Sequence, residues 1–169
     1  MALAKGKRGG TPERHVTTGK VQTSVEVMED SVLPRAGVAH TEPDAPCTPE
    51  MEPLPKELAA EPVEEKSAAQ WAYERLILYI RNFEEQLDDR QEVAMGMTGS
   101  ESGTMMIEGL GFFAPDIVTF YGRDEEGART QLIQHVSQLN VMLRALPKQD
   151  EEAEPRRIGF ELVRKLTRK

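Results

Sequence analysis

The sequence predicts an α+β domain in which one helix leads into a small, strongly bent antiparallel β-barrel, with a disordered tail in front. Three observations support this fold class. All nine aromatic residues lie at or beyond Trp71, apolar residues recur at helical spacing after Ser67, and period-two segments follow Glu92. A chain of 169 residues has the length of one ordinary domain with a tail. We therefore expect residues 67–169 to form a single folded domain.

Residues 1–66 are predicted to be a disordered tail. They contain no aromatic residue, and eight of the eleven prolines fall between Pro12 and Pro62. Such a segment cannot bury enough apolar surface to offset the chain entropy that is lost on folding. The run VQTSVEV, residues 21–27, alternates like a strand and is a candidate binding segment within the tail.

A helix is predicted over residues 67–89. Ser67 followed by Gln70 matches a capping box, in which both side chains bond backbone N–H groups at the start of the helix. Apolar residues then recur at spacings of three and four, which is the period of one helical face. They are Ala72, Leu76, Ile80, Phe83 and Leu87.

Three strands are predicted next, over residues 92–98, 104–113 and 117–122. In the first, larger apolar residues alternate with small or polar ones, and the sequence TGSESG after it is typical of a turn. The second contains Gly109 and Gly111, which predict a bend or a bulge. The third is rich in β-branched and aromatic residues, which favour strands.

The segment RTQLIQHVSQLNVMLRALPK, residues 129–148, has two interpretations. At helical spacing it shows an apolar stripe, so the alternative fold is an antiparallel sheet with a second helix at 129–146. At a spacing of two it gives strands at 129–136 and 140–146 with a turn between them. We favour two strands because weak helix formers gather in the middle of the segment. A further strand is predicted at 157–163, where apolar and polar residues alternate again.

A helix followed by five bent antiparallel strands is the element order of the Sm-like fold, an SH3-like barrel, which the sequence resembles in this respect. The segment LIQHVSQL is also similar to the part of the bacterial Sm-like RNA chaperone that reads Tyr-Lys-His-Ala-Ile-Ser. His135 and Ser137 match that segment, whereas Ile133 replaces its tyrosine and Gln134 its lysine. The resemblance implies RNA binding here, and the two replacements remove one aromatic and one basic contact.

A longer resemblance covers about residues 71–162. The strings FAPDIVTFYG, QLIQHVSQLNVMLRALP and PRRIGF resemble a bacterial family that is catalogued only as a domain of unknown function. This resemblance implies a domain boundary and a bacterial origin, and it implies no reaction.

The predicted folded body is acidic and the end of the chain is basic. Residues 67–155 carry a net charge of −9 and residues 156–169 a net charge of +5. Because an acidic body does not attract phosphate backbones, RNA would have to contact the basic end or a local patch. No apolar run is long enough to span a membrane, and no apolar signal region follows the basic start. The single cysteine, Cys47, has no partner, so we expect a cytoplasmic protein.

No catalytic, cofactor-binding or metal site is predicted. His135 is the only histidine after residue 66, and one histidine without cysteine or clustered carboxylates is a poor catalytic or metal-binding set. The predicted function is a non-catalytic binding or assembly module that is oligomeric and contacts itself or another protein. The alternative is an Sm-like RNA-binding regulator. The candidate partner or RNA contacts are Phe112, Phe113, Gln134, His135, Ser137, Arg156 and Arg157.

Overall fold

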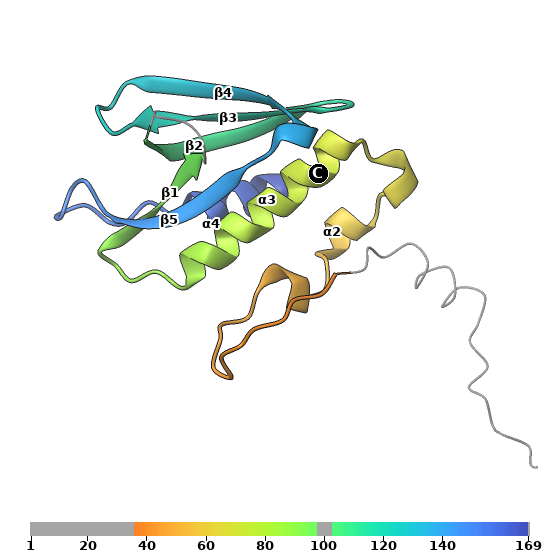
Figure 1. Cartoon of the computed structure of the whole chain (residues 1–169), viewed down its shortest axis with the longest axis horizontal. Coiled ribbons are helices and arrows are strands. Elements are labelled where there is room, and N and C mark those ends of the chain that lie inside the picture. The colour runs from red at the N-terminus through yellow and green to blue at the C-terminus, as the bar shows by residue number, and fades with distance from the viewer. Residues whose placement is uncertain (1–35, 98–102, 169) are drawn as a thin grey trace, which may run out of the picture. The chain divides into compact units, whose positions relative to one another are not determined.

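A computed structural model of the chain describes residues 36–97 and 103–168 (Figure 1). The structure is α+β, as predicted, with one long helix, a five-stranded antiparallel sheet and a C-terminal helix. The elements in chain order are η1 (Pro49–Met51), α2 (Lys56–Ala59), η2 (Val63–Glu65), α3 (Ala68–Glu85), β1 (Gln91–Met97), β2 (Thr104–Phe113), β3 (Ile117–Asp124), β4 (Arg129–His135), η3 (Val136–Gln138), β5 (Val141–Pro147) and α4 (Ile158–Leu166).

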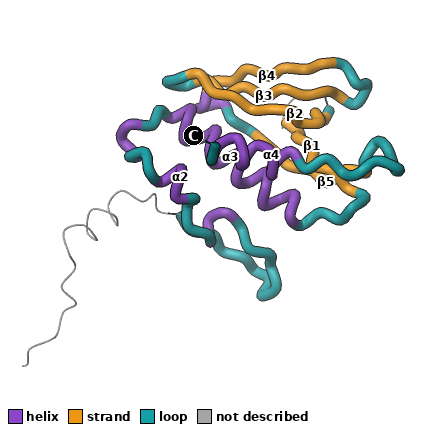
Figure 2. Tube along the Cα trace, turned by 180° about the vertical axis from the view of Figure 1, so that it is seen from behind, coloured by secondary structure: helices purple, strands orange, loops and turns teal. Residues whose placement is uncertain are grey.

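The sheet is open, which corrects the prediction of a closed barrel. Its strand order is β4-β3-β2-β1-β5, so the last strand returns to pair with the first and the described residues leave β4 and β5 at the two edges. Strands β1 and β2 pair at only two positions, while β2 bends at a register shift between Ile107 and Gly109. Figure 2 shows α3 and α4 on the same side of the sheet, with α3 against the strands. Because α3 fills this inner face, the sheet curves around the helix and its edges stay apart.

The segment from Arg129 to Lys148 forms two strands, and the alternative of a helix at 129–146 is wrong. Strand β4 pairs with β3 along its whole length, and β5 pairs with β1. The short helix η3 makes the turn between them. Leu132 lies opposite Phe120 and Leu143 lies opposite Met95, so these two leucines belong to the sheet.

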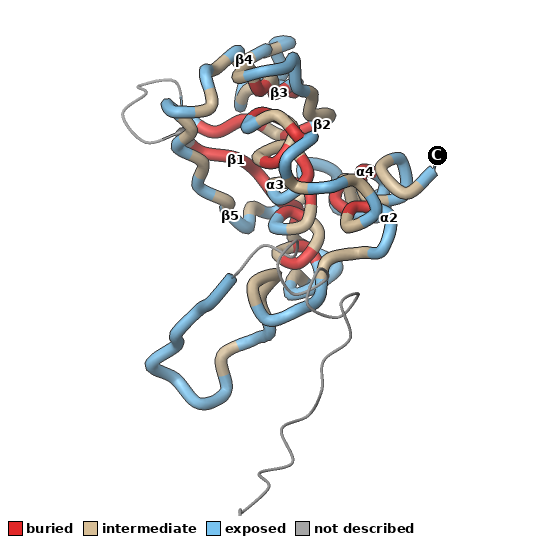
Figure 3. Tube along the Cα trace, turned by 90° about the vertical axis from the view of Figure 1, so that its right-hand side faces the viewer, coloured by how far each residue is buried: buried red, intermediate tan, exposed pale blue. Residues whose placement is uncertain are grey.

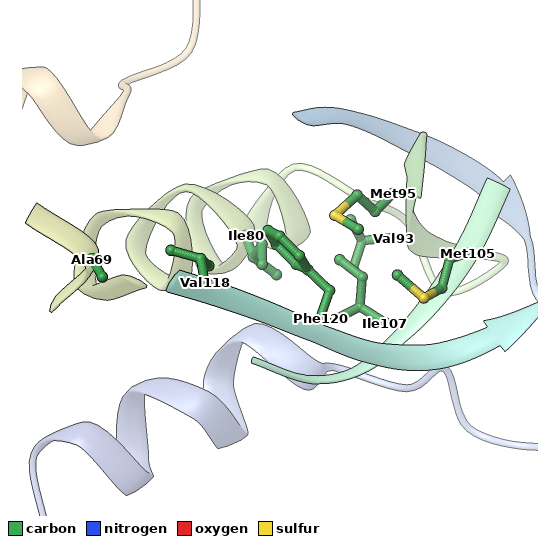
Figure 4. Packing of buried hydrophobic residues seen from close by; sticks show 8 residues of the cluster. All are labelled: Ala69, Ile80, Val93, Met95, Met105, Ile107, Val118 and Phe120. Atoms are coloured by element: carbon green, nitrogen blue, oxygen red, sulfur yellow. The ribbon is translucent and has the colours of Figure 1, made fainter. Parts of the chain in front are cut away.

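The core lies between α3 and the inner face of the sheet. Its buried side chains come from α3 and from the three central strands, and Figure 4 shows them meeting between the helix and the strands. Figure 3 shows the same distribution, with buried segments along β1, β2, β3 and α3. The cluster comprises Ala69, Ile80, Val93, Met95, Met105, Ile107, Val118 and Phe120.

Helix α3 begins at the residue that the sequence predicts. The Ser67 hydroxyl accepts the Gln70 backbone N–H at 3.1 Å. The Gln70 side chain does not complete the capping box but donates to Glu61 and Glu74 instead. The helix ends at Glu85, four residues before the predicted end at 89.

Residues 36–66 are not a disordered tail, which corrects that part of the prediction. Leu58 is 5% exposed, and the Lys66 ammonium bonds the Leu58 carbonyl and the Glu74 carboxylate. The Trp71 indole N–H donates to the carbonyl of Val63 at 3.2 Å. The aromatic surface that this segment lacks is thus supplied by α3. Residues 1–35, with the run at 21–27, lie outside the described residues.

The predicted strand at 157–163 is also corrected, because this segment forms helix α4. Ile158 packs against the core and Leu162 is buried, whereas Phe160 between them is 47% exposed. A spacing of four fits a helix, and a spacing of two among these three residues also fits a strand. The contact with α3 favours the helix, because the Gly159 backbone N–H donates to the Glu84 carboxylate at 2.7 Å.

Candidate binding surface on the outer face of the sheet

Strands β2, β3 and β4 present a surface on the side of the sheet that faces away from α3. Along β4, half-buried and exposed residues alternate, with Leu132 packed against the core and Ile133 exposed. The register extends this outward set across β3 to β2. We call the outward residues the outer face. They are Phe113, Ile117, Thr119, Tyr121, Gln131, Ile133 and His135, with Gly109 and Gly111 between them.

Cross-strand pairing brings together residues that are far apart in the sequence. Phe113 lies opposite Ile117, which lies opposite His135. Directly opposed residues have Cβ atoms about 4.5–5.5 Å apart, so these three form one row. In a second row, Thr119 lies between Gly111 and Ile133. Phe113 and His135, two of the residues singled out in the sequence, therefore share one end of the outer face.

The outer face exposes large apolar side chains. Phe113 is 76% exposed, Ile133 62% and Tyr121 43%. Single exposed apolar residues are ordinary on protein surfaces, but several on one flat face mark an interaction site. Three large exposed apolar side chains lie on these three strands, together with the half-buried Ile117, and this makes the outer face the candidate binding surface.

Glycines on β2 make the outer face shallow beside Tyr121. A Cβ atom added to Gly109 would lie 3.8 Å from the Tyr121 ring, and one added to Gly111 would lie 3.7 Å from it. The ring therefore leans across bare backbone, where a larger residue on β2 would stand. A hollow of about 350 Å³ continues from there, lined by Glu108, Tyr121, Gly122, Arg129, Thr130 and Gln131.

At the end of the outer face, Asp116, His135 and Ser137 form a hydrogen-bonded chain. His135 Nε2 lies 3.1 Å from Asp116 Oδ2, and His135 Nδ1 lies 2.7 Å from Ser137 Oγ. The Ser137 backbone N–H donates to Nδ1 at 3.2 Å. In the neutral ring this assigns the proton to Nε2, which donates to the Asp116 carboxylate. The Val136 N–H also donates to the Asp116 carbonyl at 2.7 Å. The turn between β2 and β3 therefore contacts the start of η3 through both the side chain and the backbone of Asp116.

This chain has the order of a nucleophile, a base and an orienting carboxylate. His135 and Asp116 have side chains 45% and 43% exposed, and neither they nor Ser137 line the hollow beside Tyr121. Acyl transfer also needs backbone or side-chain donors aimed at the developing oxyanion in a site that excludes water. The hydrogen bonds position the turn at η3, where His135 caps the helix through its Nδ1.

No cluster of three or more His, Cys, Asp or Glu side chains suited to a metal ion occurs within residues 36–97 and 103–168.

Charged residues lie at the opposite end of the outer face. The Arg123 guanidinium contacts the Glu108 carboxylate at 3.1 Å, and Arg156 reaches the same oxygen at 3.9 Å. Arg129 on β4 lies opposite Arg123 and makes no ion pair with any residue that the structure describes. Among the described residues, Arg129 thus differs from Arg123, whose guanidinium contacts Glu108.

A family model matches residues 63–161, which is more than half of the chain, and its description is a family of unknown function, DUF6173. This chain belongs to the DUF6173 family. The match includes α3, all five strands and the start of α4, so the outer face lies wholly inside the DUF6173 domain. Comparisons with curated proteins and with solved structures gave no match. None of the helices in the described part of the chain is both long and apolar enough to cross a bilayer.

Three of the residues singled out in the sequence lie on or beside one end of the DUF6173 outer face. Two others point inward, and the two arginines precede α4, from where Arg156 reaches Glu108. Phe113, His135 and Ser137 are at its end, as described above. Phe112 and Gln134 point inward, and the Phe112 ring centroid is 5.1 Å from that of Tyr73 on α3.

Arg156 and Arg157 precede α4 and hold it in place. The Arg157 guanidinium donates to the carbonyls of Gln91 and Asp88 at 2.7 and 2.8 Å. The Arg156 backbone N–H donates to the Glu92 carboxylate at 2.7 Å. These groups fasten the C-terminal helix to the start of β1.

Tyr121 and Ile133 belong to the DUF6173 outer face but were not predicted from the sequence to be contact residues. The sequence pattern that could have identified this face is the alternation along β3, where Thr119 and Tyr121 alternate with the core residues Val118 and Phe120. Choosing the face required knowing which side α3 covers, and a strand pattern alone does not give that.

Proposed function

We propose that this DUF6173 domain is a non-catalytic binding and assembly module that acts as an oligomer. The carrying observation is the outer face, where Phe113, Tyr121 and Ile133 are exposed together beside an unpaired strand edge. Apolar surface of this kind gains free energy when a partner covers it. The acidic chain, with a net charge of −8, favours a protein over nucleic acid as that partner. A bacterial, cytoplasmic setting belongs to the same proposal.

Sedimentation velocity of the full chain over a range of concentrations tests this function. We expect a mass above that of one chain at micromolar concentration, and weaker association in Ile133→Ser, which removes the 62% exposed apolar side chain of β4. The matched control is Phe160→Ser, which removes a phenylalanine that is 47% exposed on α4, away from the outer face. A chain that stays monomeric at every concentration, or that responds equally to both substitutions, would contradict the proposal.

The second candidate is an Sm-like RNA-binding regulator. Two observations favour it: β5 returns to β1 after a leading helix, and His135 and Ser137 stand together beside η3. Tyr121 also offers a ring for base stacking near the cation of Arg129. The overall charge opposes it. Fluorescence anisotropy with a labelled single-stranded RNA of mixed sequence, at low and physiological salt, decides the matter. Binding that weakens in Tyr121→Ala and Arg129→Ala would favour this candidate over protein assembly.

A further inference from the structure

Strand β4 is an edge without the usual protection against strand addition. It pairs with β3 at seven consecutive positions without a bulge, and no strand pairs with its other side within the described residues. Native edges are commonly guarded by lysine, proline, bulges or inward-pointing charge. Strand β4 has none of these. Its single formal charge, Arg129, stands at its first residue, and Ile133 near its end is 62% exposed.

The opposite edge, β5, is guarded. It contains the exposed Arg144 and ends at Pro147, which has no N–H to offer to another strand. The chain then folds back, with the Lys148 ammonium donating to the carbonyl of Ala153 at 2.7 Å. An additional strand can therefore pair more readily with β4 than with β5.

We propose that two copies of this chain join through antiparallel pairing of β4 with β4 of the partner, around a two-fold axis at Leu132. The two five-stranded sheets then form one continuous sheet of ten strands. This inference rests on the proposed assembly function and specifies its partner and geometry. A two-fold contact uses the same surface on both copies, so that surface must be complementary to itself.

The register follows from the two faces of β4. Both cores stay on the same side of the joint sheet only if outward residues of one copy meet outward residues of the other. Among the registers that satisfy this condition, the one that places Leu132 opposite the partner's Leu132 pairs all seven residues of the strand. It sets Gln131 opposite the partner's Ile133, and Thr130 opposite the partner's Gln134.

This register brings Arg129 toward the partner's β2–β3 turn, which carries a carboxylate. Arg129 comes to lie opposite the partner's His135, whose ring is held by the partner's Asp116. Arg129 makes no ion pair with the residues that the structure describes, so it meets a carboxylate-bearing turn at each end of the joint. No two acidic or two basic residues oppose each other, because Arg129 is the only lysine, arginine, aspartate or glutamate of the strand.

The register also brings a donor toward an unpaired acceptor. Gln134 Oε1 is buried without a hydrogen-bond partner among the described residues. The residue opposite it would be the partner's Thr130, whose hydroxyl within one chain donates to the Ala128 carbonyl at a long 3.2 Å. A buried acceptor without a donor costs free energy, so pairing that brings a hydroxyl near it is favoured.

Sedimentation equilibrium on the full chain tests this geometry with two matched lysine substitutions. Ile133→Lys guards the β4 edge, and Met142→Lys adds the same charge at a 41% exposed position of β5. We expect a wild-type dimer that Ile133→Lys weakens by roughly ten-fold or more and that Met142→Lys leaves unchanged. If both substitutions weaken the association equally, the two-fold pairing is overturned while the assembly function stands. If neither weakens it, both proposals are overturned, because Ile133 then takes no part in the association. A monomeric wild type overturns both.

Spin labelling gives a second readout that does not depend on affinity. The chain has one cysteine, so Cys47→Ser with Gln131→Cys carries a single label in each copy. Two-fold pairing places the two Gln131 labels close together across the joint, giving strong dipolar broadening. The same label at Arg144→Cys on β5 should give none. A short distance between labels at 144 instead of 131 would overturn the proposal.

Discussion

The Glu84 carboxylate of α3 accepts a hydrogen bond from the backbone N–H of Gly159 at 2.7 Å, joining positions 75 residues apart. Glu84 is 1% exposed, and its second oxygen, Oε1, has no hydrogen-bond partner among the described residues. Gly159 stands in the first turn of α4, where the helix leaves backbone N–H groups unsatisfied. The carboxyl of α3 thereby caps and docks the C-terminal helix.

The folded state should lose stability as the pH rises through the pKa of Glu84. Burial raises the pKa of Glu84 to about 7 from the usual 4.5, against the opposing pull of the N–H groups of α4 and of Arg157. A raised pKa means that the folded state binds the proton more tightly than the unfolded state. The stabilisation is therefore complete below about pH 4.5 and is lost as the pH rises through about 7. Urea unfolding between about pH 5 and pH 8 should show a loss on the order of 1–2 kcal/mol from this group.

Glu84→Gln is the control for that loss. The amide oxygen keeps an acceptor for the Gly159 N–H, and the side chain no longer titrates. We expect the pH dependence over this range to flatten, with the largest change in hydrogen exchange of the α4 amides. An unaltered slope in Glu84→Gln would show that the dependence arises elsewhere in this acidic chain.

Gly159→Ala should dislodge α4. An added Cβ would lie 2.6 Å from both the Cα and the N of Arg81, and backbone atoms cannot move aside as a flexible side chain can. Overpacking of this kind costs about 1–3 kcal/mol. Thermal unfolding measures the cost, and Gly37→Ala is the control because nothing lies within 4 Å of the added atom there. Equal effects of the two substitutions would mean that α4 is not seated against α3 in solution.

The five strands were predictable and α4 was not, for a physical reason that Ile158, Phe160 and Leu162 illustrate. Strands β1 to β5 each carry alternation backed by turn residues between them, and the pairing of five strands makes the pattern consistent. Ile158 and Leu162 stand four apart, which suits a helix, while Phe160 between them mimics alternation. Only the contact of Gly159 with Glu84, 75 residues away, distinguishes the two. A local pattern does not contain that contact.

The candidate site was predictable only in part for a similar reason. Phe113 and His135 could be singled out as chemically notable residues, but their common row depends on the β2–β3–β4 register. Asp116 lies in the turn between β2 and β3, and its contact with His135 Nε2 gives it a second role. The closed barrel failed because element order does not reveal that α3 fills the inner face.

Strand glycines should respond very differently to alanine. A Cβ on Gly122 would lie 2.2 Å from the backbone oxygen of Met106, so Gly122→Ala must separate β3 from β2. We expect a loss of about 2 kcal/mol or more in the free energy of unfolding. Gly109→Ala places its Cβ 3.8 Å from the Tyr121 ring, an ordinary contact, and should be neutral or slightly stabilising. Chemical denaturation of the two variants side by side gives the comparison, and comparable losses would contradict the β2–β3 register.

The segment before α3 is fastened by a buried ion pair between Lys66 and Glu74. Lys66 Nζ lies 2.8 Å from Glu74 Oε2, with side chains 0% and 7% exposed, and 4.5 Å from the centre of the Trp71 ring. Glu74→Leu leaves an ammonium group buried without its counter-ion, which costs about 3–5 kcal/mol. Lys66→Met added to it removes the stranded charge, so the double variant should recover most of that loss.

Trp71, the only tryptophan, reports this unfolding by fluorescence because it lies against both Lys66 and Arg75. The two single variants and the double variant form a cycle that isolates the pair from the packing of each side chain. Glu57→Leu serves as a matched control, since Glu57 is an exposed acid of α2 in the same segment. If Glu74→Leu costs no more than Glu57→Leu, residues 56–66 do not hold this position against α3. A large loss of unfolding free energy in Glu74→Leu, recovered in the double variant, would show that residues 56–66 pack as a fixed part of the domain. This segment has no aromatic residue of its own, and it packs against Trp71 of α3 instead.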